Sequence, residues 1–324
     1  MPAPIPAVWH PQNAEEACRL KRRFGEDAVY VSGGTLLRTQ WEAGDRQVPA
    51  GLIDLTAVKE LRGLEEEGGA LAIGALTTLT ACRREPGVQN RFPLLAEAAR
   101  AIAAPPVRNL ATIGGNVLSE VGDSLPALLA YEARLEWQQG EEVRTQAAAE
   151  WLERTRGGPE DANRLLLRIR LPLEAAEPDG GDGGNGRTFG FYEKIGRRET
   201  FVPSSVTMAI RGRIDGGGRL RDIRLAAGGG RTIPKRFPLL EERLEGAAAD
   251  DNAVLTLHRL LLEQYAPAPD PFESADYRKR VAANVAASHL WKAIRNQEGE
   301  RRAGDAAQSR EQRRPMADEA GRTG

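Results

Sequence analysis

The chain of 324 residues has only two cysteines, Cys18 and Cys82, and no Cys-x-x-Cys motif. Two thiols are too few for a thiolate-ligated iron–sulfur cluster or a four-cysteine zinc site. Both lie in segments with a helical pattern, which predicts buried free thiols. The three histidines, His10, His258 and His289, are far apart in the sequence and show no ligand spacing. The helical patterns around His258 and His289 predict partly exposed surface positions. We therefore expect no metal site.

The sequence also lacks an excess of charge of either sign and any long apolar run. Lysine and arginine number 45 against 46 aspartate and glutamate, for a formal net charge of -1. Such a balance provides no basic field for nucleic acid or anionic lipid. No stretch approaches the ~20 apolar residues that span a bilayer, and the N-terminus lacks the basic start and apolar region of a secretory signal. We expect no nucleic-acid partner, no membrane span and a cytoplasmic location.

Glycine is abundant, with 35 residues, and two glycine pairs have related surroundings. Gly33 and Gly34 follow a β-branched and aromatic segment, residues 29–31, and precede Thr35. This pattern predicts a strand that ends in a glycine turn, after which a mixed apolar segment begins. A glycine pair lets backbone N–H groups approach an anion because no Cβ atom stands in the way.

The second pair, Gly114 and Gly115, stands between Thr112 and Asn116, and Asp123 comes just before a short apolar run that predicts a helix. The threonine and asparagine add side-chain hydrogen-bond donors. The aspartate either caps the helix or accepts hydrogen bonds from a ribose. Gly-Gly-Asn is also ordinary turn chemistry, but two strand-to-glycine turns that converge on one pyrophosphate are a more specific pattern than either alone.

Six motifs, in the same order, resemble those of the FAD-binding medium subunit of the molybdenum hydroxylases, the group of xanthine dehydrogenase, carbon monoxide dehydrogenase and hydroxybenzoyl-CoA reductase. The resemblance covers residues 5 to 295. The motifs are S-G-G-T at 32–35, I-G-A-L-T-T at 73–78, V-R-N-L-A-T-I-G-G-N at 107–116, F-Y-E-K-I-G-R-R-E-T-F at 191–201, A-A-G-G-G-R-T-I-P-K-R at 226–236 and Y-R-K-R-V-A at 277–282.

The resemblance implies an α+β protein with a two-subdomain FAD-binding fold of the PCMH (vanillyl-alcohol-oxidase-like) type and a C-terminal α+β domain. For the C-terminal domain, the pattern predicts a three-stranded sheet, residues 189–194, 205–214 and 220–227, with helices packed on one face. The expected units are a first FAD-binding subdomain at 1–57, a second at 58–174, a linker at 175–188, the C-terminal domain at 189–295 and a disordered tail at 296–324.

The linker contains a formal Gly-x-Gly-x-x-Gly motif at Gly181, Gly183 and Gly186. We interpret it as a linker and not as a dinucleotide site, because no helix follows it and the neighbouring acids repel a pyrophosphate. Beyond residue 297 the sequence is highly charged and almost free of apolar residues, which predicts a mobile extension without a core.

The resemblance further implies non-covalent FAD between the first two subdomains, with its ring facing the C-terminal domain. An ammonium at Lys194 would stabilise negative charge on the reduced flavin and raise its potential. The alternative is a surface lysine paired with Glu193 or Glu199. The candidate cofactor-binding residues are Val31, Ser32, Gly33, Gly34, Thr35, Leu36, Ile102, Thr112, Gly114, Gly115, Asn116, Leu118, Asp123, Leu166 and Lys194.

Two residues and the length of one loop depart from the family pattern. Leu36 stands where the family often has an acidic residue, and Leu79 stands where a histidine is usual. The loop from Asn116 to Asp123 is about two residues shorter than is common in the family, which affects the placement of the aspartate.

No catalytic residue set stands out, so the cofactor is expected to carry the chemistry. The resemblance implies a molybdopterin-binding large subunit and a [2Fe-2S] small subunit on separate chains, with electrons leaving to NAD or another acceptor. Two alternatives remain open. One is a free-standing FAD-dependent oxidoreductase of the same fold, and the other is a flavin-free assembly or nucleotide-binding protein.

Overall fold

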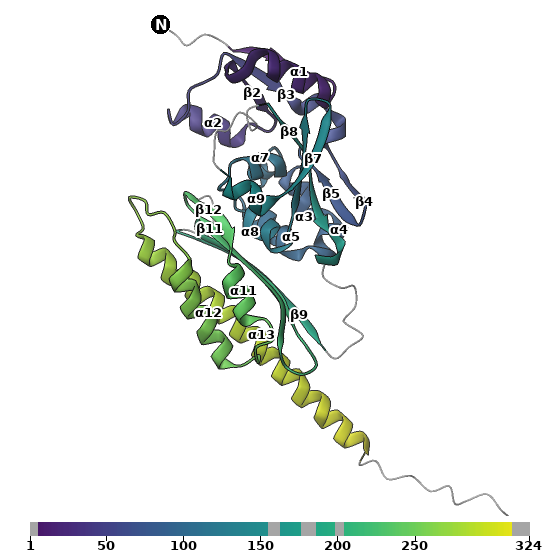
Figure 1. Cartoon of the computed structure of the whole chain (residues 1–324), viewed down its shortest axis with the longest axis vertical. Helices are drawn as coiled ribbons and strands as arrows, with labels where there is room; N and C mark the ends of the chain where they lie inside the picture. The colour runs from purple at the N-terminus through teal and green to yellow at the C-terminus, as the bar shows by residue number, and fades with distance from the viewer. Residues whose placement is uncertain (1–5, 155–162, 176–185, 198–203, 313–324) are drawn as a thin grey trace, which may run out of the picture.

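The computed structural model describes residues 6–154, 163–175, 186–197 and 204–312, with side chains up to residue 296. Three sheets follow one another along the chain (Figure 1). A small three-stranded sheet lies at the N-terminal end, a five-stranded sheet occupies the middle, and a four-stranded sheet carries the C-terminal helices. The expected α+β organisation is therefore present.

The first sheet is parallel, in the order β1-β3-β2. Helix α1 begins where the Oδ1 atom of Asn13 accepts a hydrogen bond from the Glu16 backbone N–H (2.8 Å), and it ends at Gly25 in the left-handed region (φ 52°). Both boundaries have a local cause, because asparagine is a favoured N-cap residue and glycine tolerates a positive φ after the last helical residue. The elements are β1 (Ala7–Trp9), α1 (Ala14–Phe24), β2 (Ala28–Val31), α2 (Thr35–Glu42) and β3 (Gly51–Asp54).

The five-stranded sheet is antiparallel, in the order β4-β5-β8-β6-β7, with short helices on one side. Its first hairpin turns at Gly68 and Gly69, which both have positive φ. The strands are β4 (Leu64–Glu67), β5 (Ala70–Gly74), β6 (Arg134–Gln139), β7 (Glu142–Ala147) and β8 (Leu165–Pro172). The helices are α3 (Leu79–Arg84), α4 (Pro86–Arg91), α5 (Pro93–Ala101), α6 (Pro105–Arg108), α7 (Ile113–Leu118), α8 (Leu125–Ala130) and α9 (Ala148–Glu153).

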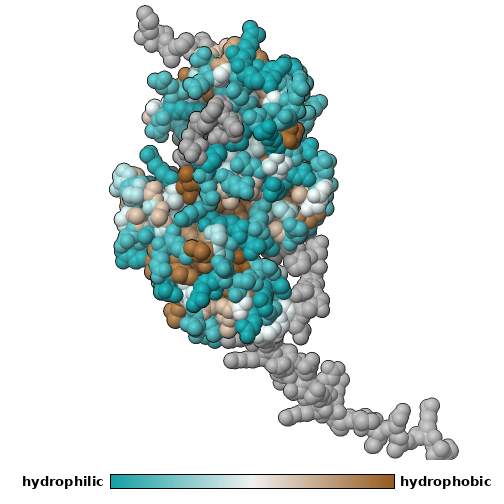
Figure 2. Space-filling model, viewed as in Figure 1, coloured by the Kyte–Doolittle hydropathy of each residue, from teal (hydrophilic) through white to brown (hydrophobic). Residues whose placement is uncertain are grey.

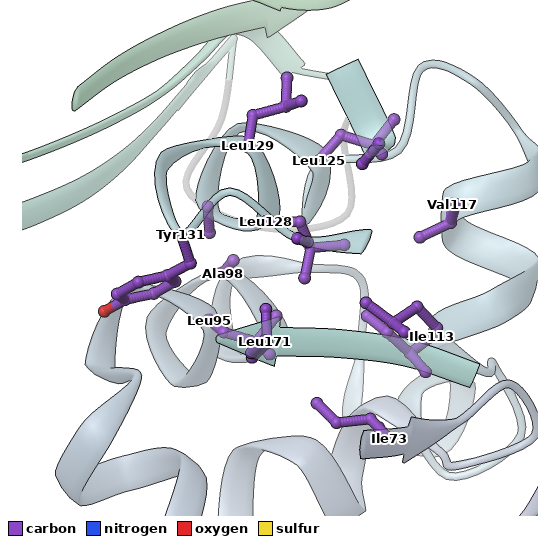
Figure 3. Packing of buried hydrophobic residues seen from close by; sticks show 14 of the residues in the cluster. Ile73, Leu95, Ala98, Ile113, Val117, Leu125, Leu128, Leu129, Tyr131 and Leu171 are labelled. Carbon is purple, nitrogen blue, oxygen red and sulfur yellow. The ribbon is translucent and has the colours of Figure 1, made fainter. Parts of the chain in front are cut away.

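A single apolar core joins this sheet to its helices. Leu95 of α5, Ile113 of α7 and Leu128 of α8 point toward Leu171 of β8 (Figure 3). All four are fully buried, and burying a side chain of this size contributes about 1.5–3 kcal/mol. The core therefore holds α7 and α8, with the loop between them, firmly on the sheet.

The third sheet is antiparallel and has four strands, in the order β12-β11-β10-β9. The prediction of three strands was wrong because the sequence pattern did not reveal β12. This strand is short and contains Pro234, and proline within a run of residues argues against a strand unless the strand lies at a sheet edge. The elements are β9 (Arg187–Gly196), β10 (Ser204–Ile214), β11 (Leu220–Gly229), β12 (Thr232–Arg236), α11 (Pro238–Leu244), α12 (Asp251–Gln264) and α13 (Ala275–Gln312).

One face of this third sheet packs against α11, α12 and α13, and the other faces α5 and α8 of the middle unit (Figure 1). Figure 2 shows a mostly hydrophilic surface, with apolar residues gathered over the region of the C-terminal helices. Two large apolar side chains there, Leu239 of α11 and Leu255 of α12, are 70% and 67% exposed.

Helix α13 continues to Gln312, beyond the point where the sequence predicts the ordered chain to end. The segment is rich in alanine, glutamate, arginine and glutamine, which have high helix propensity. Without apolar residues the segment cannot form a hydrophobic core, but it can still form a local helix. The predicted mobile extension rested on the missing core alone. The glycine-rich linker motif up to Gly183 lies outside the described residues.

Candidate functional site

The two glycine segments meet. The Oγ atom of Ser32, after β2, lies 3.2 Å from the Oγ1 atom of Thr112, before α7. A Cβ atom on Gly33 would lie 1.9 Å from the carbonyl oxygen of Leu110, so only glycine permits this approach of two backbones. That the two segments meet is confirmed, and the pyrophosphate between them stays a prediction.

The first glycine turn leads directly into α2. Gly34 adopts a left-handed conformation (φ 63°), and no side chain caps the start of the helix, where Thr35 is the first helical residue. The first N–H groups of a helix have no partner within it and carry partial positive charge. The turn after β2 therefore presents the features of an anion-binding helix N-terminus.

The second glycine pair is arranged differently from the expected strand-to-glycine turn, because it lies within α7 itself. The N–H of Gly114 donates to the carbonyl of Ala75 (2.9 Å), and the N–H of Gly115 donates to the Oγ1 atom of Thr112 (3.1 Å). Both N–H groups are used within the protein. The backbone of Ala75 packs against Gly114, where a Cβ atom would lie 2.7 Å from the Ala75 carbonyl oxygen. That the glycine pair lines a pyrophosphate site stays a prediction.

Asn116 holds the loop that follows α7. Its Oδ1 atom accepts hydrogen bonds from the N–H (3.1 Å) and the hydroxyl (2.6 Å) of Ser124, a fully buried residue. Gly122 packs against the same side chain, and a Cβ atom there would lie 2.3 Å from Oδ1. With the oxygen used in this way, the amide nitrogen is the end of the Asn116 side chain that remains to donate.

Asp123, at the end of this loop, does not cap α8, for which the Ncap position is Ser124. Its Oδ2 atom instead lies 2.7 Å from the Nζ atom of Lys194 on β9, and both side chains are 15% exposed. Its Oδ1 atom accepts a hydrogen bond from the hydroxyl of Ser204 on β10 (2.7 Å). The lysine thus pairs with an aspartate of the middle unit and not with its neighbour Glu193.

Tyr192 holds the backbone at the same point, since its hydroxyl donates to the carbonyl of Asp123 (2.8 Å). Burial raises the pKa of Tyr192 well above its usual value, and the charges of Asp123 and Glu193 raise it further. The phenol therefore stays protonated and remains a donor. Sequence reasoning missed Tyr192, Ser124 and Ser204, although Tyr192 is two residues from a predicted site residue on the same strand face.

The remaining predicted residues lie around this region. Ile102 and Leu166 are buried, at 8% and 2% exposed, whereas Leu36 and Leu118 are 45% and 47% exposed. The carbonyl of Ala101, next to Ile102, accepts a hydrogen bond from Lys194 (3.3 Å). Val31 ends β2.

A pocket of about 480 Å³ is lined in part by Ser204, the residue whose hydroxyl donates to Asp123. The guanidinium of Arg197 lies 3.9 Å from the ring centre of Phe272. Beneath the pocket, the buried Arg278 pairs with Asp270 and with Glu273 (3.4 Å). The lining residues that bear on function are Arg197, Ser204, Gly230, Arg231, Phe272 and Arg278.

The described residues include no group of three or more histidine, cysteine, aspartate or glutamate side chains placed to hold a metal ion. Within the same part of the chain, none of the helices combines the length and apolar character that a membrane crossing requires.

A family model described as the FAD binding domain in molybdopterin dehydrogenase matches residues 5–174. The chain belongs to this FAD-binding family. A second model, the CO dehydrogenase flavoprotein C-terminal domain, matches residues 191–293.

Named proteins that are similar to this chain support the same family assignment. The chain is 32% identical over 278 residues to the carbon monoxide dehydrogenase medium chain of Hydrogenophaga pseudoflava, covering 85% of this chain and 92% of the relative. It is 26% identical to a putative xanthine dehydrogenase FAD-binding subunit of Escherichia coli K12, covering 75% and 81%. A solved structure of the Hydrogenophaga enzyme, lacking the Mo-pyranopterin moiety, has a TM-score of 0.81 at 30% identity and covers 92% of this chain and 99% of its own.

As a member of this FAD-binding family, the protein binds FAD and is an oxidoreductase subunit of the molybdenum hydroxylase group. The resemblance to FAD-binding medium subunits and the fold class expected from it are confirmed. The geometry fits a flavin dinucleotide, because an uncapped helix N-terminus suits the diphosphate and an ammonium lies at the junction with the C-terminal sheet.

Proposed function

We propose that this subunit passes electrons from an iron–sulfur partner to an acceptor that binds in the pocket beside Phe272. The observation that supports the proposal is that Ser204, which donates to Asp123 of the Asp123–Lys194 pair, also lines this pocket. FAD, when bound, supplies a centre that takes up single electrons and releases a pair as a hydride. The chain itself binds, orients and shields that centre.

In this proposal the diphosphate of FAD binds at the N-terminus of α2. Gly33, Gly34 and Thr35 present their N–H groups there, and Ser32 and Thr112 provide hydroxyls alongside. The other predicted residues, Val31, Leu36, Ile102, Gly114, Gly115, Asn116, Leu118, Asp123 and Leu166, surround the cofactor or support the residues that contact it. The second glycine pair acts by close packing and not by its N–H groups.

The ring of the cofactor is placed between the middle unit and the C-terminal sheet, beside Lys194. An ammonium with only 15% exposure exerts a stronger field than one in water. That field favours negative charge on the reduced ring and so raises its reduction potential. The buried neighbours Ile102 and Leu166 exclude water from this region.

The partners in this proposal are a molybdopterin-binding large subunit and a [2Fe-2S] small subunit on separate chains. Related proteins are named medium chains or FAD-binding subunits, which supports an assembly of several chains. Cys18 and Cys82 are both buried, and two cysteines are too few for a thiolate-ligated cluster, which supports clusters on another chain. The cytoplasmic location expected from the sequence stays a prediction.

For the acceptor we propose NAD, bound in the pocket of about 480 Å³. Such a volume suits a small-molecule site. Phe272 offers an exposed ring for stacking, and Arg197 and Arg231 offer cations for phosphate. Ser204 connects this site to the Asp123–Lys194 pair, beside which we propose the flavin ring.

The first test is an absorption spectrum of the purified full-length chain, with the released chromophore identified by mass. One FAD per chain is expected, and co-purification of the two partner chains separates a subunit from a free-standing flavoenzyme. The flavin-free alternative does not fit the FAD-binding family to which the chain belongs.

The acceptor is tested by anaerobic reduction of the FAD-loaded chain with NADH. Phe272→Ala is expected to raise the NADH concentration at half-maximal rate about tenfold, or about 1.4 kcal/mol. Leu239→Ala, an equally exposed apolar side chain on α11, is the control. If NADH does not reduce the wild-type flavin but a quinone reoxidises it, the acceptor is not NAD.

A further inference from the structure

Asp123 is held from three directions by residues of the C-terminal sheet. Lys194 contacts its Oδ2 atom at 2.7 Å, and the Ser204 hydroxyl donates to its Oδ1 atom at 2.7 Å. The Tyr192 hydroxyl donates to its backbone carbonyl at 2.8 Å. The two strands β9 and β10 thus fix both the backbone and the carboxylate of one loop residue from the middle unit.

The charges in this cluster are shielded from solvent. The side chains of Asp123 and Lys194 are each 15% exposed, and Ser204 is 6% exposed. In such a setting a hydrogen bond to a carboxylate is charge-assisted and roughly twice as strong as a neutral one. The carboxylate therefore divides its negative charge between the serine hydroxyl and the lysine ammonium.

We propose that Ser204 is a positioning residue that determines how far Asp123 neutralises Lys194, and thereby sets the reduction potential of the flavin. The inference rests on the proposed placement of the flavin ring beside Lys194. Tyr192 supports the same arrangement by holding the backbone of Asp123 in place.

The direction of the effect follows from the sharing of charge. Without the serine hydroxyl, the carboxylate loses its second donor, and more of its negative charge faces Lys194, which it already contacts at 2.7 Å. The ammonium then exerts a weaker net positive field at the ring, so negative charge on the reduced flavin is less stabilised. Removal of the hydroxyl therefore lowers the reduction potential.

The next residue on the same strand provides a matched control. Ser205 is also buried, at 3% exposed, and its hydroxyl donates to the Oε1 atom of Glu273 (2.6 Å) and not to Asp123. Because neighbouring side chains on a strand point to opposite faces, a serine-to-alanine change at 205 has a similar structural cost without touching the Asp123–Lys194 pair.

The experiment measures the flavin midpoint potential of the full-length, FAD-loaded chain against reference dyes, with the FAD to protein ratio checked for each variant. Ser204→Ala is expected to lower the equilibrium constant for reduction by about three- to tenfold, which for a two-electron couple is about 15–30 mV. Ser205→Ala is expected to leave the potential unchanged, and Ser204→Thr, which keeps the hydroxyl, to restore it.

Ser204→Cys, which keeps the size and supplies a weak donor, is expected to give an intermediate potential and serves if the alanine variant loses FAD. Equal potentials for the Ser204→Ala and Ser205→Ala proteins would overturn the positioning role.

Lys194→Met separates the positioning role of Ser204 from the proposed placement of the flavin ring. If it lowers the potential while Ser204→Ala does not, only the positioning role fails. If it also leaves the potential unchanged, the flavin is not beside Lys194 and the proposed placement fails as well.

Discussion

Gly33 and the carbonyl of Leu110 are so close that a Cβ atom on the glycine would lie 1.9 Å from the oxygen. The neighbouring atom belongs to the backbone, so it cannot move aside as the end of a flexible side chain can. This contact locks the turn before α2 to the segment before α7, and so joins the two halves of the proposed diphosphate site.

Gly33→Ala is expected to separate the two segments. Overpacking at a rigid contact costs about 1–3 kcal/mol, and we expect the dissociation constant for FAD to rise at least about tenfold. Gly87→Ala is the control, because its nearest neighbour at 3.3 Å is the flexible end of Arg91. FAD titration by fluorescence measures both. Wild-type affinity in Gly33→Ala would show that the two segments need not meet.

Asn116→Ala is expected to weaken both folding and FAD binding. The change leaves the N–H and hydroxyl of the buried Ser124 without their acceptor, which costs about 1–3 kcal/mol. Urea unfolding and FAD titration test the two effects. Asn109→Ala, which removes an exposed side-chain hydrogen bond with Thr80, is expected to change neither. Equal losses in both variants would mean that Asn116 has no special role.

Glu132→Gln is expected to remove a pH-dependent contribution to stability. Burial alone would raise the pKa of Glu132, but a hydrogen bond from Arg236 and the charge of Arg224 lower it below its usual 4.5. Because the folded-state pKa is depressed, the contribution is fully present above pH 4.5 and is lost as pH falls through the lower folded value.

Urea unfolding at pH 7 and pH 3 tests this expectation. The stability difference between the wild type and Glu132→Gln should be smaller at pH 3 than at pH 7. Glu142→Gln, whose pair with Arg144 is exposed at the surface, should change stability by less than about 1 kcal/mol at either pH. A constant difference between wild type and Glu132→Gln at both pH values would contradict the ionic explanation.

Cys82 is expected to be unreactive in the native protein. Burial raises the pKa of its thiol to about 12, so the nucleophilic thiolate is scarce at pH 8. Burial also raises the pKa of Cys18, despite a hydrogen bond from Tyr30. Iodoacetamide labelling followed by intact mass should show no modification of the native chain and two in urea. Labelling of the folded protein at Cys82 would show that the helix α3 opens readily.

Local features were predictable because their causes lie within a few residues. The start of α1 follows from the side chain of Asn13, and its end follows from Gly25. The start of α11 at Pro238 also has a local cause, because proline favours the first helical turn. The short strand β12 was missed because its proline contradicts the usual strand pattern, and its pairing with β11 and packing on α8 and α9 are tertiary contacts.

The sequence by itself determined the family, the cofactor and the residues around the glycine turns, because these depend on short motifs whose chemistry is local. Tertiary structure alone decided how those residues are used. The N–H of Gly114 donates to the carbonyl of Ala75, which lies 39 residues earlier in the chain, and the hydroxyl of Ser204 donates to Asp123, which lies 81 residues earlier. Such contacts depend on how separate sheets pack, which no local pattern contains.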